Sequence, residues 1–318
     1  MTKPVTVKAP GELLPFLFAT WPETKKTRIR SLLKHQSVTV NGEPVTQFNH
    51  PLLPGDVVSI RPVRYAAPKS SISAGIKVWF EDAHLIVIDK PSGLLSVAST
   101  AEDERTAYFQ ITNHLRGNRM NSRERVWIVH RLDKETSGLM VFAKTPEAKE
   151  FLQGRWEENE KHYEAVIEGR LRNREGIFAC DLDESNKFKV RIAKASELTR
   201  HAITHYRVLA EDAKVSLVHL RLETGRRHQI RVQLAAEGCP IIGDEKYGAV
   251  TDPAGRLGLH ATFLKFFHPA TREEMRFTSP LPRTLNAHAP SKTQTYFTGS
   301  QHGNPQTRSL SSEGDSNK

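Results

Sequence analysis

The densest group of reactive side chains in this 318-residue chain lies between residues 130 and 137. Asp133 stands there with Arg131 two positions before it and Lys134 directly after it. Nearby positive charge offsets the upward pKa shift that burial of a carboxyl group causes. An ionised and well-positioned carboxylate can act as a nucleophile or as a general base. The other interpretation is a solvated turn with surface ion pairs, which charge density alone favours.

Two apolar runs flank this polar stretch and must position it. Residues 126–129 and 139–143 are rich in valine and other apolar residues, as buried strands are. We therefore expect the polar residues to form a loop between two strands. A rigid scaffold that carries a charged loop is a usual way to present catalytic groups.

A second informative run covers residues 222–234. It predicts a strand that passes through Thr224-Gly225 into a helix. The free backbone N–H groups at the helix N-terminus, with Arg226, Arg227 and His228 beside them, would suit a phosphate or a carboxylate. Without further context, the basic residues would be only a solvated helix surface.

Four ordered blocks resemble the motifs of the RluA-like family of RNA pseudouridine synthases. The longest reads His-Arg-Leu-Asp, two further residues, then Thr-Ser-Gly-Leu. The blocks cover roughly residues 76–282, and they are 89–94, 130–139, 161–163 and 222–248. The resemblance implies an α+β fold, with a mixed, mainly antiparallel sheet flanked by helices.

The resemblance also implies roles for single residues. It makes Asp133 the catalytic aspartate and Arg231 its ion-pair partner. It makes Tyr163 the aromatic residue that stacks on the extruded base, and Arg131 the side chain that fills the space left by the flipped uridine. Taken alone, Tyr163 would be a core or edge-strand aromatic. The residues expected to bind substrate are His130, Arg131, Thr136, Arg226, His228 and Gln229.

The chain departs from the family pattern at two positions of the last block. Arg227 occupies a position often held by a small or different residue, and Gln233 stands where the family usually has histidine. Neither residue touches the expected catalytic groups. We expect both to alter the contacts with RNA.

The implied reaction is the isomerisation of uridine to pseudouridine. It breaks the N-glycosidic bond, rotates the uracil and rejoins it to the ribose through carbon 5. The sequence leaves open whether Asp133 adds to the base, attacks carbon 1′ or removes the 2′ proton. No cofactor and no metal are expected. Cys180 and Cys239 lie far apart, without the spacing of zinc ligands or of a disulfide framework.

Residues 10–62 resemble an S4 RNA-binding domain. The pattern predicts two helices, then a hairpin with an Asn41-Gly42 turn, and a further strand after Pro54-Gly55-Asp56. It departs from the S4 pattern in its first helix, at residues 13–16. The alternative is a basic helix face that is only solvated. The basic residues expected to contact RNA are Lys26, Arg28, Arg30 and Lys34.

The remaining stretches set the expected domain boundaries. Residues 63–75 are expected to form a linker, residues 76–290 the catalytic domain, and residues 291–318 a disordered tail poor in apolar residues. Within the catalytic domain, Thr145-Pro146-Glu147 predicts the start of a helix that runs to about Asn159.

Charge and composition agree with a nucleic-acid partner. The chain has 46 Lys and Arg against 36 Asp and Glu, a net charge of +10 and a pI near 9.6. Such a charge suits an RNA backbone, but also DNA, an anionic membrane or an acidic protein. No apolar segment is long enough to span a membrane, and no signal peptide is evident. We therefore expect a cytoplasmic monomer that acts on RNA and not on membranes.

Three functions remain to be weighed. The first is a pseudouridine synthase acting on ribosomal RNA, with tRNA as the other substrate that such enzymes use. The second is a non-catalytic RNA chaperone or ribosome-assembly factor, although the presence of Asp133, Tyr163 and Arg231 together argues against a degenerate site. The third is a metal-dependent nuclease or hydrolase, which would need clustered carboxylates.

Overall fold

The structure is a computed structural model with two compact units. One unit comprises residues 1–66 with 266–277, and the other comprises residues 67–265 with 278–318. The residues that the structure describes are 4–34, 37–60, 63–65, 70–72, 75–98, 105–117, 124–186, 188–291 and 307–309.

The first unit is a small α/β structure built around one apolar cluster. Leu13 and Leu17 of the first helix pack with Ile29 and Leu33 of the second and with Val38 of the sheet, all with 1% exposure or less. Its elements are β1 (Val5–Thr6), β2 (Gly11–Glu12), α1 (Leu13–Thr20), α2 (Lys26–Lys34), β3 (Val38–Val40), β4 (Glu43–Pro44), β5 (Pro51–Leu52), β6 (Val57–Ile60), β7 (Val63–Tyr65) and β19 (Glu274–Thr278).

The predicted hairpin between β3 and β4 is present. Asn41 and Gly42 have φ angles of 51° and 90°, which is the left-handed backbone that this two-residue turn requires. The Asn41 carboxamide also donates to Asp56 and accepts from the backbone N–H of Val57. These bonds fasten the turn to Asp56 and to the first residue of β6.

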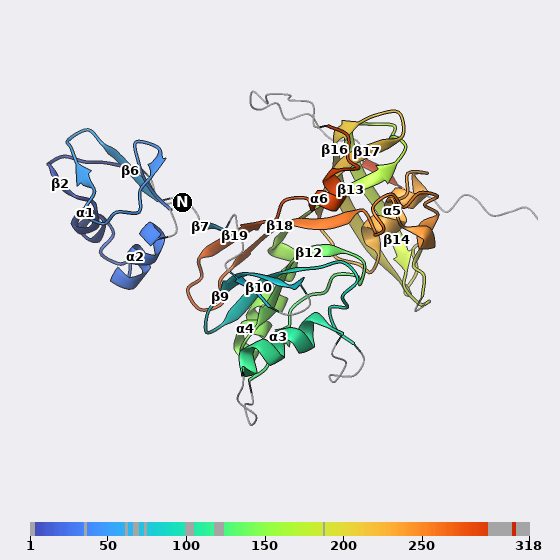
Figure 1. The fold of residues 1–318 in the computed structure, drawn as a ribbon, viewed down its shortest axis with the longest axis horizontal. Helices are drawn as coiled ribbons and strands as arrows, with labels where there is room; N and C mark the ends of the chain where they lie inside the picture. Colours follow the sequence, from blue (N-terminus) through green and yellow to red (C-terminus); the bar gives the residue numbers. More distant parts are fainter. Residues whose placement is uncertain are drawn as a thin grey trace, which may run out of the picture. The chain divides into compact units, whose positions relative to one another are not determined.

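The second unit contains one large sheet with helices packed on it (Figure 1). Its elements are β8 (Ser70–Ser71), β9 (Lys77–Glu81), β10 (Leu85–Lys90), α3 (Ala107–Arg116), β11 (Trp127–Ile128), β12 (Ser137–Ala143), α4 (Pro146–Gly154), η2 (Trp156–Glu158), β13 (Glu160–Glu168), β14 (Glu175–Asp183), β15 (Arg191–Ala193), β16 (Thr199–Glu211), β17 (Val215–Leu222), α5 (Gln229–Ala236), η3 (Glu245–Tyr247), β18 (Leu259–Phe267), α6 (Arg283–Asn286) and β20 (Thr307–Ser309).

The sheet is mixed and mainly antiparallel, as expected. Its strand order is β15-β14-β16-β17-β13-β18-β12-β10-β9-β8. The parallel pairing along this path joins β12 to β18, with Ser137 opposite His260 and Gly138 opposite Ala261. This pairing matters for the site, because β12 begins directly after the polar loop that carries Asp133.

Two apolar clusters cover one face of this sheet. Ala107 and Ile111 of α3 pack over β9, β10 and β12, while Ile230 and Leu234 of α5 pack over β13 and β17. Tyr163, on β13, contacts both clusters. The functional cleft described below lies on this face, beside Tyr163.

Helix α4 is shorter than expected. Thr145 caps it by accepting a bond from Ala148 N, and Pro146 is its first residue, as predicted. The helix ends at Gly154 and not near Asn159. Residues Trp156–Glu158 form the 3₁₀ turn η2 instead, and the carbonyl of Trp156 accepts a bond from the buried Lys161 side chain at the start of β13.

Three other stretches differ from the expected boundaries. Within the expected linker, residues 63–65 and 70–71 form strands β7 and β8. Residues 266–277, which we assigned to the catalytic domain, group with the first unit because β19 pairs with β7. In the expected disordered tail, Thr307–Ser309 form β20 and pair with β14. The rest of that tail after Ser291 lies outside the described residues.

No helix in the described part of the chain is both long enough and apolar enough to cross a membrane.

Candidate active site

A cleft of about 440 Å³ lies where the loop after β11, strand β13 and the start of α5 meet. Part of this volume is open to solvent. Ligand sites are typically concave and combine apolar walls with a few convergent polar groups, as this cleft does. The side chains and backbone that line it belong to Arg131, Leu132, Asp133, Thr136, Tyr163, Leu222, Gly225, Arg226, His228, Gln229, Ile230, Arg231 and Leu259.

Asp133 and Arg231 meet at the cleft although they are 98 positions apart in the chain. Arg231 Nη1 donates to Asp133 Oδ2 at 3.2 Å, and the exposed fractions of the two side chains are 5% and 18%. The resemblance predicted this ion pair. Because Arg231 occupies one side of the carboxylate, the partly exposed remainder of Asp133 faces the cleft.

Asp244 holds the other side of Arg231. Its two carboxylate oxygens accept from Arg231 Nε and Nη2, each at 2.7 Å, and Asp244 is 1% exposed. Burial alone would lower the pKa of Arg231, but the carboxylates of Asp244 and Asp133 outweigh it and raise the pKa. This two-point bond fixes the plane of the guanidinium group and therefore the direction from which it meets Asp133.

His228 stands at the N-terminus of α5 beside the same carboxylate. Its Nε2 is 3.9 Å from Asp133 Oδ2, and its Nδ1 is 2.7 Å from the Tyr247 hydroxyl. His228 has a left-handed backbone, with φ of 54°. His228 is one of the residues that line the cleft.

Lys90 holds the Asp133 loop through hydrogen bonds to backbone carbonyls. This lysine is fully buried, and its Nζ donates to the carbonyls of Pro91, Leu94 and Lys134 at 2.9, 2.7 and 3.0 Å. Burial lowers the pKa of Lys90 to about 7, opposed by the negative charge of Asp133. One amine thus joins the turn after β10 to the loop that carries the carboxylate.

The end of that loop is held by a series of hydrogen bonds between buried and half-buried polar groups. Arg256 donates to Ser137 Oγ, Ser137 bonds to His260 Nδ1 at 2.7 Å, and His260 Nε2 bonds to Ser279 Oγ at 3.1 Å. Ser279 in turn donates to Asp89 at 2.7 Å. These hydrogen bonds connect Ser137 of β12 with His260 of β18, and they therefore fix the position at which β12 begins.

Tyr163 forms part of the cleft wall, as expected. Burial and then the charge of Asp133 raise the pKa of its hydroxyl, so the phenol stays neutral. Its flat ring beside Asp133 has the placement that a base-stacking residue needs. Arg131 also lines the cleft and is exposed, which leaves its side chain able to meet RNA.

His130 is the one expected substrate-binding residue that does not line the cleft. Its ring stacks on Trp156, with 4.2 Å between centroids, and its Nε2 accepts a bond from Val141 N. Burial lowers the pKa of His130 to about 3. The ring of His130 therefore packs under the loop. Nothing in its position suggests that it contacts the substrate.

Gln229 lines the cleft, but its polar atoms are already engaged. Its Oε1 accepts from Thr224 and from Arg226 N, and its Nε2 donates to Ile203 O and Thr204. Gln229 therefore shapes the start of α5. A substrate could make van der Waals contact with Gln229, but its amide is already hydrogen-bonded within the protein.

The two departures from the family pattern make contacts within the protein, and that either residue alters RNA contacts stays a prediction. Gln233 is fully buried and bonds to Thr204 and Ala202. Arg227 donates to the carbonyls of Glu184 and Asn186, which anchors the loop between β14 and β15.

The basic residues of α2 belong to the first unit. Lys26 and Arg30 both lie over the ring of Phe18, at 5.5 and 5.4 Å from its centroid. Arg28 forms an ion pair with Glu273 of the same unit. The side chain of Lys34 lies outside the described residues. That these residues bind RNA stays a prediction.

Sequence reasoning gave no role to Asp244, Tyr247 or Lys90. Each lies inside a quoted motif, so its position was visible. The missing information was the partner, because each contacts residues far away along the chain. Among the described residues, no three His, Cys, Asp or Glu side chains are arranged as ligands of a metal ion.

Comparison with known proteins agrees with this geometry. The family model for RNA pseudouridylate synthase matches residues 84–236, which include Asp133, Tyr163 and Arg231. A protein of Bacillus subtilis (strain 168), called uncharacterized RNA pseudouridine synthase YhcT, is 33% identical over 288 residues, or 88% of this chain and 93% of that protein. This chain belongs to the RNA pseudouridylate synthase family.

Other family members extend the comparison. The ribosomal large subunit pseudouridine synthase D of Nitrosomonas europaea is 32% identical over 84% of this chain and 80% of its own length. Among solved structures, human RNA pseudouridylate synthase domain containing 4 is similar with a TM-score of 0.54 and 26% identity, over 66% of this chain and 90% of that one. The chain is thus an RNA pseudouridine synthase, an isomerase, with the fold of its family.

Proposed function

We propose that this synthase isomerises specific uridines of large-subunit ribosomal RNA, with Asp133 as the catalytic carboxylate. The observation that carries the proposal is the cleft that Asp133 lines together with its ion-pair partner Arg231 and with Tyr163. The ribosomal target is supported by relatives from Nitrosomonas europaea and Vibrio cholerae, both called ribosomal large subunit pseudouridine synthase D.

The cleft accounts for the steps that the reaction needs. A uridine must leave its stack to reach Asp133, which costs a few kcal/mol, and stacking on Tyr163 with insertion of Arg131 offsets that cost. The buried Arg231 keeps Asp133 oriented toward the ribose and base. The basic residues of α2 would add contacts to the RNA backbone that do not depend on sequence.

The decisive experiment compares pseudouridine maps of total RNA. Carbodiimide treatment and primer extension would be applied to large-subunit rRNA and tRNA from cells without the gene and from cells complemented with wild type or Asp133→Asn. We expect one or a few rRNA stops to disappear without the gene, and only wild type to restore them.

In vitro, Asp133→Asn should form no detectable pseudouridine, at least about 10²-fold below wild type, because the amide is neither nucleophile nor base. RNA affinity, measured by filter binding, should be nearly unchanged. Substantial residual turnover would remove Asp133 from the proposed role. An unchanged map of rRNA and tRNA would instead favour a non-catalytic RNA-binding protein.

A further inference from the structure

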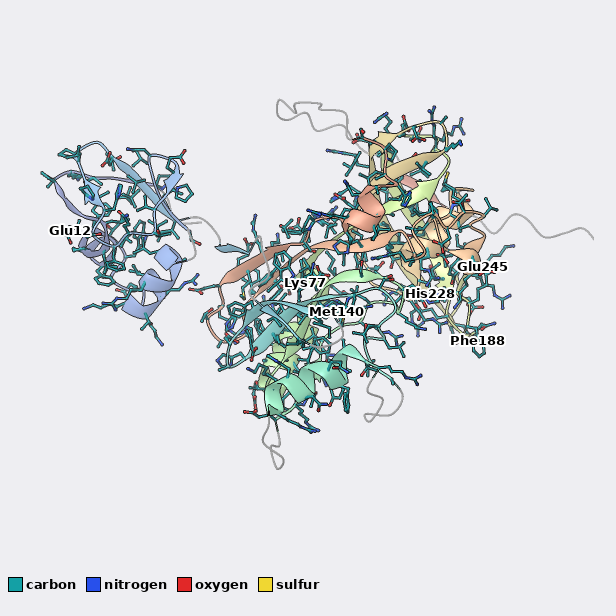
Figure 2. The ribbon with its side chains drawn as sticks, in the orientation of Figure 1. Glu12, Lys77, Met140, Phe188, His228 and Glu245 are labelled. Atoms are coloured by element: carbon teal, nitrogen blue, oxygen red, sulfur yellow. The ribbon has the colours of Figure 1, made fainter. Side chains whose placement is uncertain are left out.

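The hydroxyl of Tyr247 joins the start of α5 to the loop before β15. It accepts a bond from Val190 N at 3.0 Å, and it lies 2.7 Å from His228 Nδ1. Tyr247 is 9% exposed. Figure 2 labels His228 and Glu245, the first residue of η3, in the same part of the second unit, and η3 carries Tyr247.

Counting donors and acceptors favours one direction for the short bond. The phenol has one O–H to donate, and the Val190 N–H already uses an acceptor site on its oxygen. Among the described residues, the hydroxyl has no hydrogen-bond partner other than Val190 and His228. A buried donor without a partner is costly, so the arrangement that satisfies every group has the O–H donating to His228 Nδ1. In that arrangement Nδ1 is unprotonated, and the ring proton is on Nε2.

The Nε2–H of His228 is the atom that faces the cleft. It lies 3.9 Å from Asp133 Oδ2, too far for a hydrogen bond to that oxygen but within the space that a flipped uracil would enter. Burial, together with the positive charges of Arg231, Lys246 and Arg227, lowers the pKa of His228 against the opposing charge of Asp133. The lowered pKa favours the neutral ring, in which Nε2–H is a donor.

We propose that Tyr247 is a positioning residue that holds His228 in its Nε2–H tautomer, and that this N–H stabilises the uracil leaving group. The inference rests on the proposed function. When the bond between carbon 1′ and N1 breaks, the electron pair stays with the uracil, whose negative charge spreads to its carbonyl oxygens. His228 donates a hydrogen bond to one of these oxygens and transfers no proton. Donors aimed at developing charge act strongly in a partly dry site.

Tyr247 also contacts Arg231, and a variant that tests the role of the hydroxyl must keep this second contact. The Arg231 guanidinium lies over its ring, 5.2 Å from the centroid. Tyr247→Phe keeps this ring and removes only the hydroxyl. The variant therefore separates the hydrogen bond to His228 from the packing of the Asp133–Arg231 pair.

The first measurement is the tautomer itself. Long-range ¹H–¹⁵N spectra of the full-length wild type should show His228 with a protonated Nε2 and a bare Nδ1 near neutral pH. Tyr247→Phe should shift the ring toward a mixture that includes the Nδ1–H form. A wild type with Nδ1 protonated would overturn the proposal.

The second measurement is single-turnover pseudouridine formation in ribosomal RNA. Tyr247→Phe should lower the rate constant by about 10-fold, the value of one hydrogen bond, without changing RNA affinity. Tyr108→Phe, on α3 and not among the residues that line the cleft, serves as the matched control and should leave the rate unchanged. An unchanged rate in Tyr247→Phe would contradict the proposal.

Two substitutions of His228 separate a donor role from a structural one. His228→Asn suits the left-handed backbone but is too short to reach the cleft, and should lower the rate by about 10²-fold or more. His228→Gln has an amide that can take the place of Nε2–H and should recover part of that loss. Equal rates in the two variants would overturn the donor role.

Failure of the proposed function gives a different pattern. If wild type leaves ribosomal RNA unmodified, the proposed target is wrong. The tautomer measurement would still decide whether Tyr247 sets the protonation of His228, because it needs no RNA.

Discussion

Asp133 owes its orientation to Arg231 and, through Arg231, to Asp244, which does not line the cleft. Arg231 reaches Asp133 with one nitrogen and gives two to Asp244. A guanidinium without Asp244 would be free to rotate and to pair with Asp133 through both nitrogens. The buried carboxylate therefore decides how much of Asp133 stays available for chemistry.

We predict that Asp244→Asn lowers both stability and activity. Removing one partner of a buried charge pair costs about 3–5 kcal/mol, so urea unfolding should shift to a clearly lower midpoint. Turnover should fall by about 10²-fold in the folded fraction because Asp133 loses its orientation. Asp181→Asn is the control.

Asp181 pairs with His201 on the surface of the same unit. Such exposed pairs contribute less than about 1 kcal/mol, so the control should unfold close to wild type. An Asp244→Asn protein that is as stable and as active as this control would show that Asp244 does not position Arg231.

At the scale of elements, the site depends on the parallel pairing of β12 with β18. Gly138, at the start of β12, has φ of +121° and lies opposite Ala261. A Cβ on Gly138 would come within 2.8 Å of the Ala261 Cα and closer still to its backbone N and O. Only glycine allows the strands to approach this closely directly after the Asp133 loop.

We predict that Gly138→Ala destabilises the protein by about 3 kcal/mol or more, since both the backbone conformation and the contact with Ala261 are unfavourable. Thermal unfolding followed by circular dichroism measures this. Gly154→Ala at the end of α4, where no atom lies within 4 Å of the added Cβ, should stay within about 1 kcal/mol of wild type. Equal effects in the two variants would contradict the role of the close approach.

At the scale of the second unit, histidines with lowered pKa values make the stability of the fold depend on pH. Burial lowers the pKa of His130 and His260 to about 3 each, and that of His162 to about 4. In the unfolded chain, each would titrate near 6.5. Protonation of His260 would also place a donor at Nδ1, opposite the Ser137 hydroxyl that bonds to it.

We predict that the free energy of unfolding falls as pH decreases from about 6.5 toward 4. In this window the unfolded chain binds protons that the folded chain does not, so acid favours unfolding, by about 1.4 kcal/mol per pH unit for each histidine. Urea unfolding at a series of pH values gives the slope. A free energy that stays constant between pH 6.5 and 4.5 would contradict the proposed burial of neutral rings.

Much of this protein follows from the sequence because the signals are local. Asn41-Gly42 sets a turn through backbone angles, and Thr145-Pro146 starts a helix through one cap. The Asp133 loop was recognisable because its residues are contiguous, and the resemblance of a second motif, at residues 222–248, implied that Arg231 is its partner. In each case the physical cause lies within a few residues of the pattern, or within a motif long enough to be specific.

Only the tertiary structure decided what depends on contacts between distant segments. His130 lies in the same motif as Asp133, yet its ring packs on Trp156 and not in the cleft. Lys90 bonds to the carbonyl of Lys134, 44 positions away, and Tyr247 bonds to the N–H of Val190, 57 positions away. A motif names the residue types that chemistry needs, but the direction of each side chain is set by strand pairing and packing, which no short stretch of sequence contains.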